Sequence, residues 1–391
     1  MQTLGGGVLQ IRTPYTLPCR EKKRGRKRKK GRRGKAGAGS FPVLKSLGVA
    51  IGVTPALCEE ATLAALNNTF DEAAGAFARR GVPISAKRIR SISEKFAGVS
   101  LQLRQNELQE YHDGICETTP ALSQQRVAVC IDGGRINIRT PKNGRIPADS
   151  KRRGFNANWR EPKMFTVYTL DDKGDKRKDS PTFCDGTIAN PDAVFDLLAA
   201  ELYRNGAQDA REIVFLSDGA PWIWNRLDTL AKQIGLSRNI VHKILDFSHA
   251  VQHLYTIADL LPGLGGKRKK RWVKKMKNLL RESADDFLDE LSRALGGARN
   301  KKLRREYNYF LKNKEHIRYK KFIRKKLPIG SGSVESAIRR VINLRLKGAG
   351  MFWLKENAEG FLHLRCQTKS GNWNTFFQRV LQFMCEGYNR V

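Results

Sequence analysis

The sequence predicts an α/β fold in which a mixed β-sheet carries helices on both faces. Short runs rich in β-branched and aromatic residues, such as residues 126–132 and 211–217, have the length and composition of buried strands. Helix-like segments alternate with the later strands, which is typical of sheets that contain parallel strands. The chain has 391 residues, of which 40% are hydrophobic, so it can bury a sizeable core.

The composition indicates a polyanionic partner. The chain has 73 Lys and Arg residues against 38 Asp and Glu residues, a net charge of +35. A compact protein with this excess repels itself, and nucleic acid is the simplest partner that relieves the repulsion. The seven cysteines include no pair with CxxC spacing, which favours reduced thiols in a cytoplasmic setting. No apolar run approaches the roughly 20 residues that span a bilayer, so no membrane partner is expected.

Residues 1–40 are predicted to be a basic, disordered arm. Within it, residues 20–35 contain twelve basic side chains and one acidic side chain. Such a block has no apolar surface to bury and is expected to seek phosphate groups.

Residues 41–120 are predicted to be helical and to bind DNA. A helix over about 70–80, a turn at residues 81–83 and a second helix capped by Ser85 follow from the capping and turn signals. This spacing is typical of a helix-turn-helix, although an ordinary helical hairpin gives a similar pattern. The basic residues at the start of the second helix are Lys87, Arg88 and Arg90.

Residues 121–262 are predicted to form the first part of a catalytic core. Residues 126–132 alternate as a strand and end at Asp132, and residues 135–140 alternate again after the Gly133-Gly134 turn. A third strand is expected in residues 163–175. We expect these strands to pair as hairpins in one sheet.

Two further strands alternate with helices. A helix over residues 190–206 leads into the strand that ends at Asp218, and another helix begins near Pro221. Residues 239–246 form a fifth predicted strand, followed by a helix over 247–262. Three hairpin-connected strands followed by helix, strand, helix and strand predict a ribonuclease-H-like mixed sheet.

The rest of the chain is predicted to be a helical insertion and the end of the core. Residues 263–327 are basic and helical, and residues 328–391 contain the last helices. The first of these helices is amphipathic, with Glu335 at the edge of its apolar stripe. The residues of that stripe are Val334, Ile338, Val341 and Ile342.

Asp132, Asp218 and Glu335 are candidates for an acidic metal site. Strands that lie side by side would bring the two aspartates to one edge, and the amphipathic helix could add Glu335. Crowded carboxylates repel one another unless cations neutralise them, and Mg²⁺, or Mn²⁺ in its place, prefers such oxygen ligands. An Asp-Gly pair after a strand is also an ordinary turn, but two such pairs in a basic chain favour the metal site. We expect Gly219 to leave room for metal and DNA.

Two other motifs allow alternative interpretations. Trp222 and Trp224 are expected to pack in the core, although stacking on DNA bases is the alternative. Asp246 and His249 form a D-x-x-H motif that either supports the active site or caps a helix. The side chains predicted to contact DNA are Arg135, Lys87, Arg88, Arg90, Trp222, Trp224, Arg339 and Arg345.

Five motifs in order resemble the transposases of ISKra-type bacterial insertion sequences, relatives of the Mutator-like DDE transposases. They are "IDGGRINIR", "W-x-EPK" (Trp159 to Lys163), "SDGAPWIWN", "LDFSHAVQHL" and "GSGSVESAIRRVINLRLKGAGMFW". The resemblance covers about residues 126–366. Related proteins often carry paired cysteines near the amino terminus, whereas Cys19 has no partner nearby, so a zinc module is not expected.

The resemblance implies a ribonuclease-H-like DDE domain with the triad Asp132, Asp218 and Glu335, and a helical insertion between the last two. It implies that Asp246 and His249 are accessory to the site. It also implies Mg²⁺-dependent cleavage of double-stranded DNA at element ends, strand transfer, a homo-oligomer on DNA and a nucleoid-associated location in the bacterial cytoplasm. The alternatives are a decayed, non-catalytic DNA-binding protein and a ribonuclease-H-like nuclease.

Overall fold

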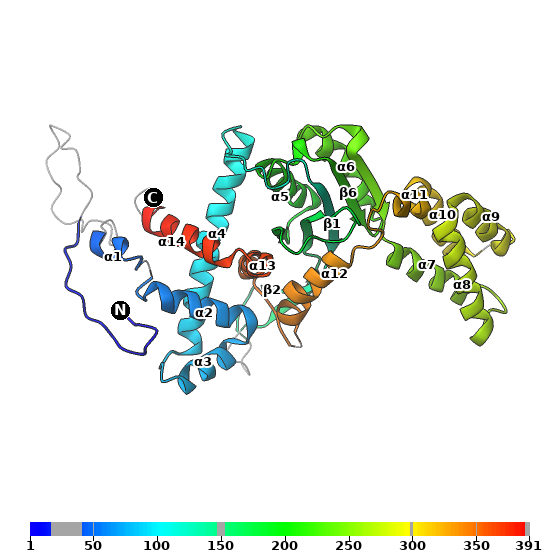
Figure 1. Cartoon of the computed structure of the whole chain (residues 1–391). Helices are drawn as coiled ribbons and strands as arrows, with labels where there is room; N and C mark the ends of the chain where they lie inside the picture. Colours follow the sequence, from blue (N-terminus) through cyan, green and yellow to red (C-terminus); the bar gives the residue numbers. More distant parts are fainter. Residues whose placement is uncertain (17–40, 50, 147–152, 298–299, 349, 388–391) are drawn as a thin grey trace, which may run out of the picture. The chain divides into compact units, whose positions relative to one another are not determined.

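The computed structural model describes residues 1–16, 41–49, 51–146, 153–297, 300–348 and 350–387 (Figure 1). The chain divides into two compact units. One unit is helical and comprises Met1–Asn106 with Asn372–Val391, and the other comprises Glu107–Gly371. The polybasic run at residues 20–35 lies outside the described residues.

The helical unit is built from capped amphipathic helices. Thr54 caps one helix and Thr69 forms a capping box with Glu72 at the next. Phe96 stacks on Phe377 at 5.1 Å between ring centroids, which joins the first and last segments of the chain into one core. The helices are α1 (Pro42–Ser46), α2 (Pro55–Asn67), α3 (Phe70–Arg79), the first part of α4 (Ala86–His112) and α14 (Trp373–Gly387).

The two predicted helices around the turn at residues 81–83 are confirmed as α3 and α4. The Ser85 hydroxyl accepts the Arg88 backbone N–H at 3.2 Å, so Ser85 caps α4 as expected. Arg88 donates to the Ile51 carbonyl and Arg90 pairs with Glu94, while Lys87 is exposed. Two of the three basic side chains therefore also have contacts within this unit.

The first sixteen residues do not fit the expectation of a disordered arm. Gln2 pairs with Val8 and with Val53, and its backbone carbonyl accepts the Thr54 N–H at 3.1 Å. The Gln2 side chain donates to the Pro83 carbonyl at 3.0 Å. This segment lacks the charge of residues 20–35, and its backbone finds partners in the helical unit.

The second unit contains a mixed sheet that is compatible with a ribonuclease-H-like fold. Among the described residues it has five strands in the order β5-β4-β1-β6-β7. β4 is antiparallel to both of its neighbours, whereas β1, β6 and β7 are parallel. The strands are β1 (Arg126–Gly133), β4 (Lys163–Leu170), β5 (Thr182–Thr187), β6 (Glu212–Ser217) and β7 (Val241–Leu245).

Residues 135–140 were correctly predicted to form a strand, but their expected place in the main sheet was wrong. They form β2 (Ile136–Pro141), which pairs with β3 (Phe155–Arg160) in a separate two-stranded ribbon. β5 takes the expected place in the sheet. β3 is exposed along its whole length, and β5 contains Asp185 and Gly186, so neither segment has the apolar pattern that predicts a strand.

Helices cover both faces of the sheet. α5 (Pro191–Arg204) and α6 (Pro221–Gln233) pack on the face that receives the odd-numbered residues of β1 and β6. On the other face, α12 (Gly332–Ile338) contacts β1 and β4. α13 (Lys355–Ser370) contacts β5, the edge strand of the sheet. The predicted apolar stripe of the Glu335 helix is confirmed, because Val334, Ile338, Val341 and Ile342 are all buried.

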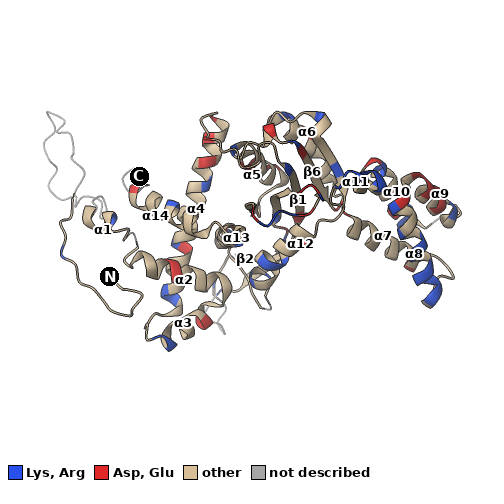
Figure 2. Ribbon diagram, in the orientation of Figure 1, with Lys and Arg blue, Asp and Glu red and all other residues tan. Residues whose placement is uncertain are grey.

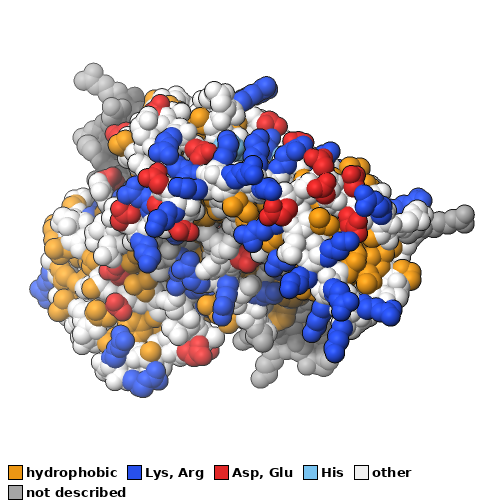
Figure 3. All heavy atoms as spheres, turned by 45° about the vertical axis from the view of Figure 1, so that its right-hand side comes forward, with side chains coloured by type: hydrophobic (Ala, Val, Ile, Leu, Met, Phe, Trp, Pro, Cys, Tyr) orange, Lys and Arg blue, Asp and Glu red, His pale blue; other side chains and the backbone are white. Residues whose placement is uncertain are grey.

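The described residues between 266 and 324 are mostly helical, as expected, and strongly charged. α8 carries exposed Lys and Arg side chains and buries Val273, Met276 and Leu280 (Figure 2). Figure 3 shows basic side chains spread over this region with acidic ones among them. None of the described helices has the length and hydrophobicity needed to cross a bilayer. The helices here are α7 (Phe247–Leu260), α8 (Gly266–Glu282), α9 (Ala284–Leu295), α10 (Lys301–Lys312) and α11 (Tyr319–Arg324).

Candidate active site

The three parallel strands end at one level, and an aspartate stands at each end. Cys130 in β1 lies opposite Leu216 in β6, and Ser217 lies opposite Leu245 in β7. Continuing these registers places Asp132, Asp218 and Asp246 in one row across the carboxyl edge of the sheet. The expectation that the strands of Asp132 and Asp218 are neighbours is therefore confirmed, and Asp246 extends the row.

The row faces the helix that carries Glu335. Successive side chains of a strand alternate between faces, and the odd-numbered residues of β1 and β6 face α5 and α6. Asp132 and Asp218 are even-numbered and so belong to the opposite face, where α12 packs against β1. Glu335 lies in the first turn of α12.

Asp246 connects three segments of the chain. Its carboxylate accepts the His249 backbone N–H at 2.7 Å, which makes it the N-cap of α7. It also accepts the His249 Nδ1–H at 3.2 Å and the backbone N–H of Ser331, just before α12. Although burial raises the pKa of Asp246, these hydrogen bonds lower it to about 2. The ionised Asp246 carboxylate thus links His249 and the start of α12 to the end of β7.

His249 is positively charged at neutral pH. The hydrogen bond to Asp246 raises the pKa of His249 to about 9, and the charges of Asp132 and Asp218 add to this effect. The side chain is 25% exposed, so the imidazolium lies at the edge of the site rather than in the core. The capping interpretation of the D-x-x-H motif is confirmed, because Asp246 caps α7, and a role of His249 in the active site stays a prediction.

Asp132 experiences the crowding of negative charge directly. Burial raises the pKa of Asp132, and the nearby charges of Asp218 and Glu335 raise it too, whereas the hydrogen bond from the Gly133 N–H lowers it. The resulting pKa is about 6. The ionised form of Asp132 is therefore disfavoured in this structure. A divalent cation among these oxygens would remove that penalty.

The turn after β6 is held from outside the sheet. The Asp218 carboxylate accepts the Ala220 N–H at 2.9 Å, and the Asp218 backbone carbonyl accepts the Tyr309 hydroxyl of α10 at 2.8 Å. Gly219 has a φ of +85°, and a Cβ there would lie 2.8 Å from Leu245 and 3.1 Å from Tyr309. The expectation that Gly219 leaves room for metal and DNA was wrong, because side chains of β7 and α10 fill that space.

Glu335 is exposed and is followed by an unusual helical segment. Residues Arg339–Leu346 form a π-helix, in which the Lys347 N–H donates to the Ile342 carbonyl at 3.0 Å. The buried Arg365 guanidinium donates to the carbonyls of Arg340 and Val341. These contacts satisfy carbonyls in the π-helix and fix the segment that follows Glu335.

Among the described residues, one group of side chains has ligand atoms close enough to share a metal ion, and it differs from the predicted triad. The ligand atoms of Asp246, His249 and Glu335 lie within 4.8 Å of one another. Within this group, the hydrogen bond to Asp246 raises the pKa of His249 to about 9, and the Asp246 carboxylate accepts three N–H donors. We therefore regard Asp246 and His249 as a charged pair beside the site. Asp132 and Asp218 are not part of that group, so a cation held by Asp132, Asp218 and Glu335 stays a prediction.

Several residues that were predicted to contact DNA make packing contacts within the fold. Trp222 meets Phe195 edge to face, and Trp224 stacks on His316 at 4.7 Å, so both pack against the core as the first interpretation expected. Arg345 is 4% exposed and lies over the Trp353 ring at 5.0 Å, which fits a structural role better than the predicted DNA contact. Arg135 and Arg339 are exposed and stay predicted DNA contacts.

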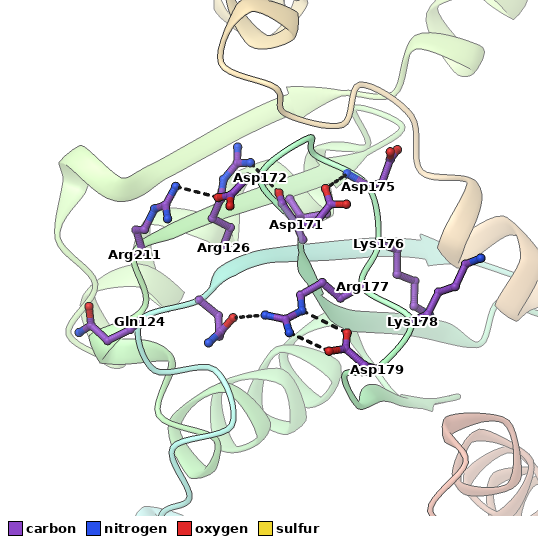
Figure 4. A pocket seen from close by; sticks show the side chains of 12 residues that line it. Gln124, Arg126, Asp171, Asp172, Asp175, Lys176, Arg177, Lys178, Asp179 and Arg211 are labelled. Atoms are coloured by element: carbon purple, nitrogen blue, oxygen red, sulfur yellow. Dashed lines mark hydrogen bonds and ion pairs between the residues drawn. The ribbon is translucent and has the colours of Figure 1, made fainter.

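A cavity of about 640 Å³ lies at the opposite edge of the sheet (Figure 4). It is lined by the start of β1, by the turn after β4 and by Arg211. Arg126 in its wall pairs with Glu212 at 2.9 Å and donates to the carbonyls of Asp171, Lys325 and Lys326, so its guanidinium joins segments of the fold. The aspartates and basic side chains of this cavity are mixed, and none belongs to the predicted site.

No protein-family model matches the sequence, and no curated protein matches it. Among solved structures, one described as the crystal structure of a pre-cleavage Mos1 transpososome aligns with 67% of this chain and 75% of its own. The identity is 11% and the TM-score is 0.17. This is a weak similarity to a transposase complex.

Proposed function

We propose that this chain is a DNA transposase that cleaves the ends of an insertion sequence and joins the free 3′-hydroxyl to target DNA. The observation that carries the proposal is the register of β1, β6 and β7, which aligns Asp132, Asp218 and Asp246 beside the Glu335 helix. The net charge of +35 supports a nucleic-acid substrate. The five motifs that resemble ISKra-type transposases support the choice of reaction within this class.

Asp132, Asp218 and Glu335 would hold the metal, Mg²⁺ or Mn²⁺. When bound between carboxylates, such ions activate the attacking oxygen and stabilise the leaving oxygen of a phosphodiester. Cleavage and strand transfer are both in-line displacements at phosphorus, so one site can serve both.

The residues around the carboxylates would orient the substrate. His249 is a cation on the rim of the site and is suited to a DNA phosphate. Asp246 acts through His249 and Ser331 and is a positioning residue in this scheme. Tyr309 holds the Asp218 turn and has the same kind of role.

The test is incubation with DNA that carries the flanking element ends and Mg²⁺, followed by mapping of the cut strands. Asp132→Asn, Asp218→Asn and Glu335→Gln should each abolish cleavage and leave DNA binding close to wild type, because each removes a ligand oxygen at constant shape. Asp172→Asn, in the cavity at the opposite edge, is the matched control and should cleave normally.

The products separate the proposal from its alternatives. Strand-transfer products support a transposase, whereas cleavage without joining indicates a nuclease of the same fold. DNA binding without any metal-dependent cleavage indicates a non-catalytic protein. If one of the three triad variants cleaves at a near-normal rate, that residue is not a metal ligand.

A further inference from the structure

The ribbon of β2 and β3 projects from the carboxyl edge of the sheet. Two residues separate the end of β1 at Gly133 from the start of β2, and β3 returns to β4, whose Lys163 lies opposite Gly133. Both ends of the ribbon therefore lie next to Asp132. No residue of β2 or β3 is among the predicted site residues, although Arg135, which directly precedes β2, is one of them.

One face of the ribbon is anchored and the other is open. Ile136 and Ile138 of β2 are buried, and the β2 backbone exchanges hydrogen bonds with Trp353 at 2.8 and 3.0 Å. The opposite face carries Arg139 and, on β3, Phe155 and Trp159. All six residues of β3 are exposed, and Trp159 is 59% exposed. The indole is therefore not needed to fill the core.

The open face combines aromatic rings with positive charge. The Arg139 guanidinium lies 5.9 Å from the Phe155 ring centroid, and Phe155 meets the partly exposed Phe352 at 5.0 Å. In the described part of the ribbon and its flanks, residues 135–146 and 153–160, no side chain is acidic. None of the basic side chains there forms an ion pair within the described residues: Arg135, Arg139, Lys142, Arg145, Arg153 and Arg160.

We propose that this ribbon binds a DNA strand with unpaired bases beside the site, with Trp159 as the platform on which a base stacks. Exposed aromatic rings among unpaired cations are the combination that holds single strands, because the cations follow the phosphates and the rings take the bases. A closed duplex hides its base faces, so the indole selects DNA that is opened next to the carboxylates. The basic helix α8 carries one aromatic ring, Trp272, which is partly buried, whereas the Trp159 ring is exposed.

This inference rests on the proposed function, since it needs DNA at the carboxyl edge of the sheet. The experiment therefore measures binding without metal. Fluorescence anisotropy in EDTA at fixed salt compares a blunt duplex with a forked duplex of the same sequence, whose end is unpaired. The proteins are the wild-type chain, Trp159→Ala, Trp159→Phe and the control Tyr255→Ala. Tyr255 lies on α7 and is 47% exposed, so it offers an equally accessible ring away from the ribbon.

Trp159→Ala should weaken binding of the forked duplex by about 5- to 150-fold, the loss expected for one stacked base. Binding of the blunt duplex should change by less than about 2-fold, as for an ordinary surface substitution. Trp159→Phe should keep most of the affinity, and Tyr255→Ala should behave as wild type. A forked duplex with 2-aminopurine at the unpaired position adds a direct signal, because stacking quenches its fluorescence and Trp159→Ala should remove the quenching.

Other outcomes overturn the inference. Equal losses on forked and blunt DNA would show that the ribbon serves phosphates only, and an unchanged affinity with unchanged quenching would show that Trp159 takes no base. A Trp159→Ala chain that binds DNA normally but changes from dimer to monomer would make the ribbon an interface between copies. If the wild-type chain binds neither DNA, the proposed function fails together with this inference.

Discussion

Asp246→Asn should strongly destabilise the second unit, the α/β unit Glu107–Gly371, because it breaks the hydrogen bonds that join the end of β7 to α7 and to the start of α12. Asparagine has nearly the same shape, but it carries no charge and has only one acceptor oxygen. Its amide group would face the Ser331 N–H or the two donors of His249. A buried N–H would then lose its partner, and His249 would lose its counter-charge.

The magnitude follows from the pKa values. The pKa of Asp246 falls from 3.8 to about 2, and one pKa unit corresponds to 1.36 kcal/mol, so the interactions of the ionised form stabilise the fold by roughly 2.5 kcal/mol. The rise of the His249 pKa from 6.5 to about 9 reflects the same contact and is not added. The unpaired Ser331 N–H costs a further 1–3 kcal/mol or so. We expect a total loss of about 3.5–5.5 kcal/mol, close to the range of about 3–5 kcal/mol for breaking a buried ion pair.

The two pKa shifts determine how the stability difference between wild type and Asp246→Asn depends on pH. The folded-state pKa of Asp246 is lowered, so its contribution is present above pH 3.8 and is lost as the pH falls through about 2. The pKa of His249 is raised, so its contribution is complete below pH 6.5 and is lost as the pH rises through about 9. The difference between wild type and Asp246→Asn should therefore be largest between about pH 4 and 6.5 and smaller above pH 9.

Denaturant unfolding followed by tryptophan fluorescence is a suitable assay, because five of the six tryptophans lie in the α/β unit. Asp228→Asn is the matched control. Asp228 also forms an ion pair, with Lys243 at 2.7 Å, but it is 80% exposed, so its loss should cost about 0–1 kcal/mol. If Asp246→Asn lowers the free energy of unfolding no more than this control, or by an amount independent of pH between 5 and 9.5, the Asp246 carboxylate does not stabilise the fold as argued.

Two further changes near the row have opposite expected effects on stability. Gly219→Ala should destabilise by about 2–4 kcal/mol in the same unfolding assay, from the positive φ and the close approach to Leu245 and Tyr309; a loss below about 1 kcal/mol would show that the turn relaxes freely. Asp132→Asn should stabilise the metal-free chain at pH 7–8 by up to about 3 kcal/mol, because the pKa of Asp132 is raised from 3.8 to about 6 and its ionisation disfavours the folded state above that range. The advantage should vanish below about pH 4, and a destabilised Asp132→Asn chain would contradict the crowding of charge.

The sequence predicts the part of the site that depends on local pattern. Asp132 and Asp218 each follow a buried apolar run, and the order of strands and helices makes those runs neighbours. The stripe of Val334 and Ile338 likewise fixes which face of α12 is buried and leaves Glu335 outside it. These predictions hold because burial selects one face of each element and chain order restricts which strands can pair.

Other features depend on contacts that no local pattern reveals. Tyr309 and Ser331 reach Asp218 and Asp246 across 91 and 85 residues of sequence. A tyrosine in a basic helix and a serine in a glycine-rich loop give no signal of that role. β3 was missed for a different reason, since it is exposed on both faces and its stability comes from pairing with β2. Because none of the residues of such a strand is buried, its sequence has no hydrophobic pattern that predicts a strand.

The carboxylate row places like charges close together, and long-range contacts are what keep it in place. Asp246 ties the start of α12 to β7, Tyr309 ties α10 to the Asp218 turn, and Ile342 of the π-helix packs so close to Gly134 that no Cβ would fit there. Each contact joins a different segment to the same edge of the sheet. A site stabilised in this way can hold repelling groups before any cation arrives, which is the arrangement expected where function conflicts with stability. Loss of a tether should therefore disturb the site together with the fold, whereas loss of a carboxylate should remove activity while relieving strain.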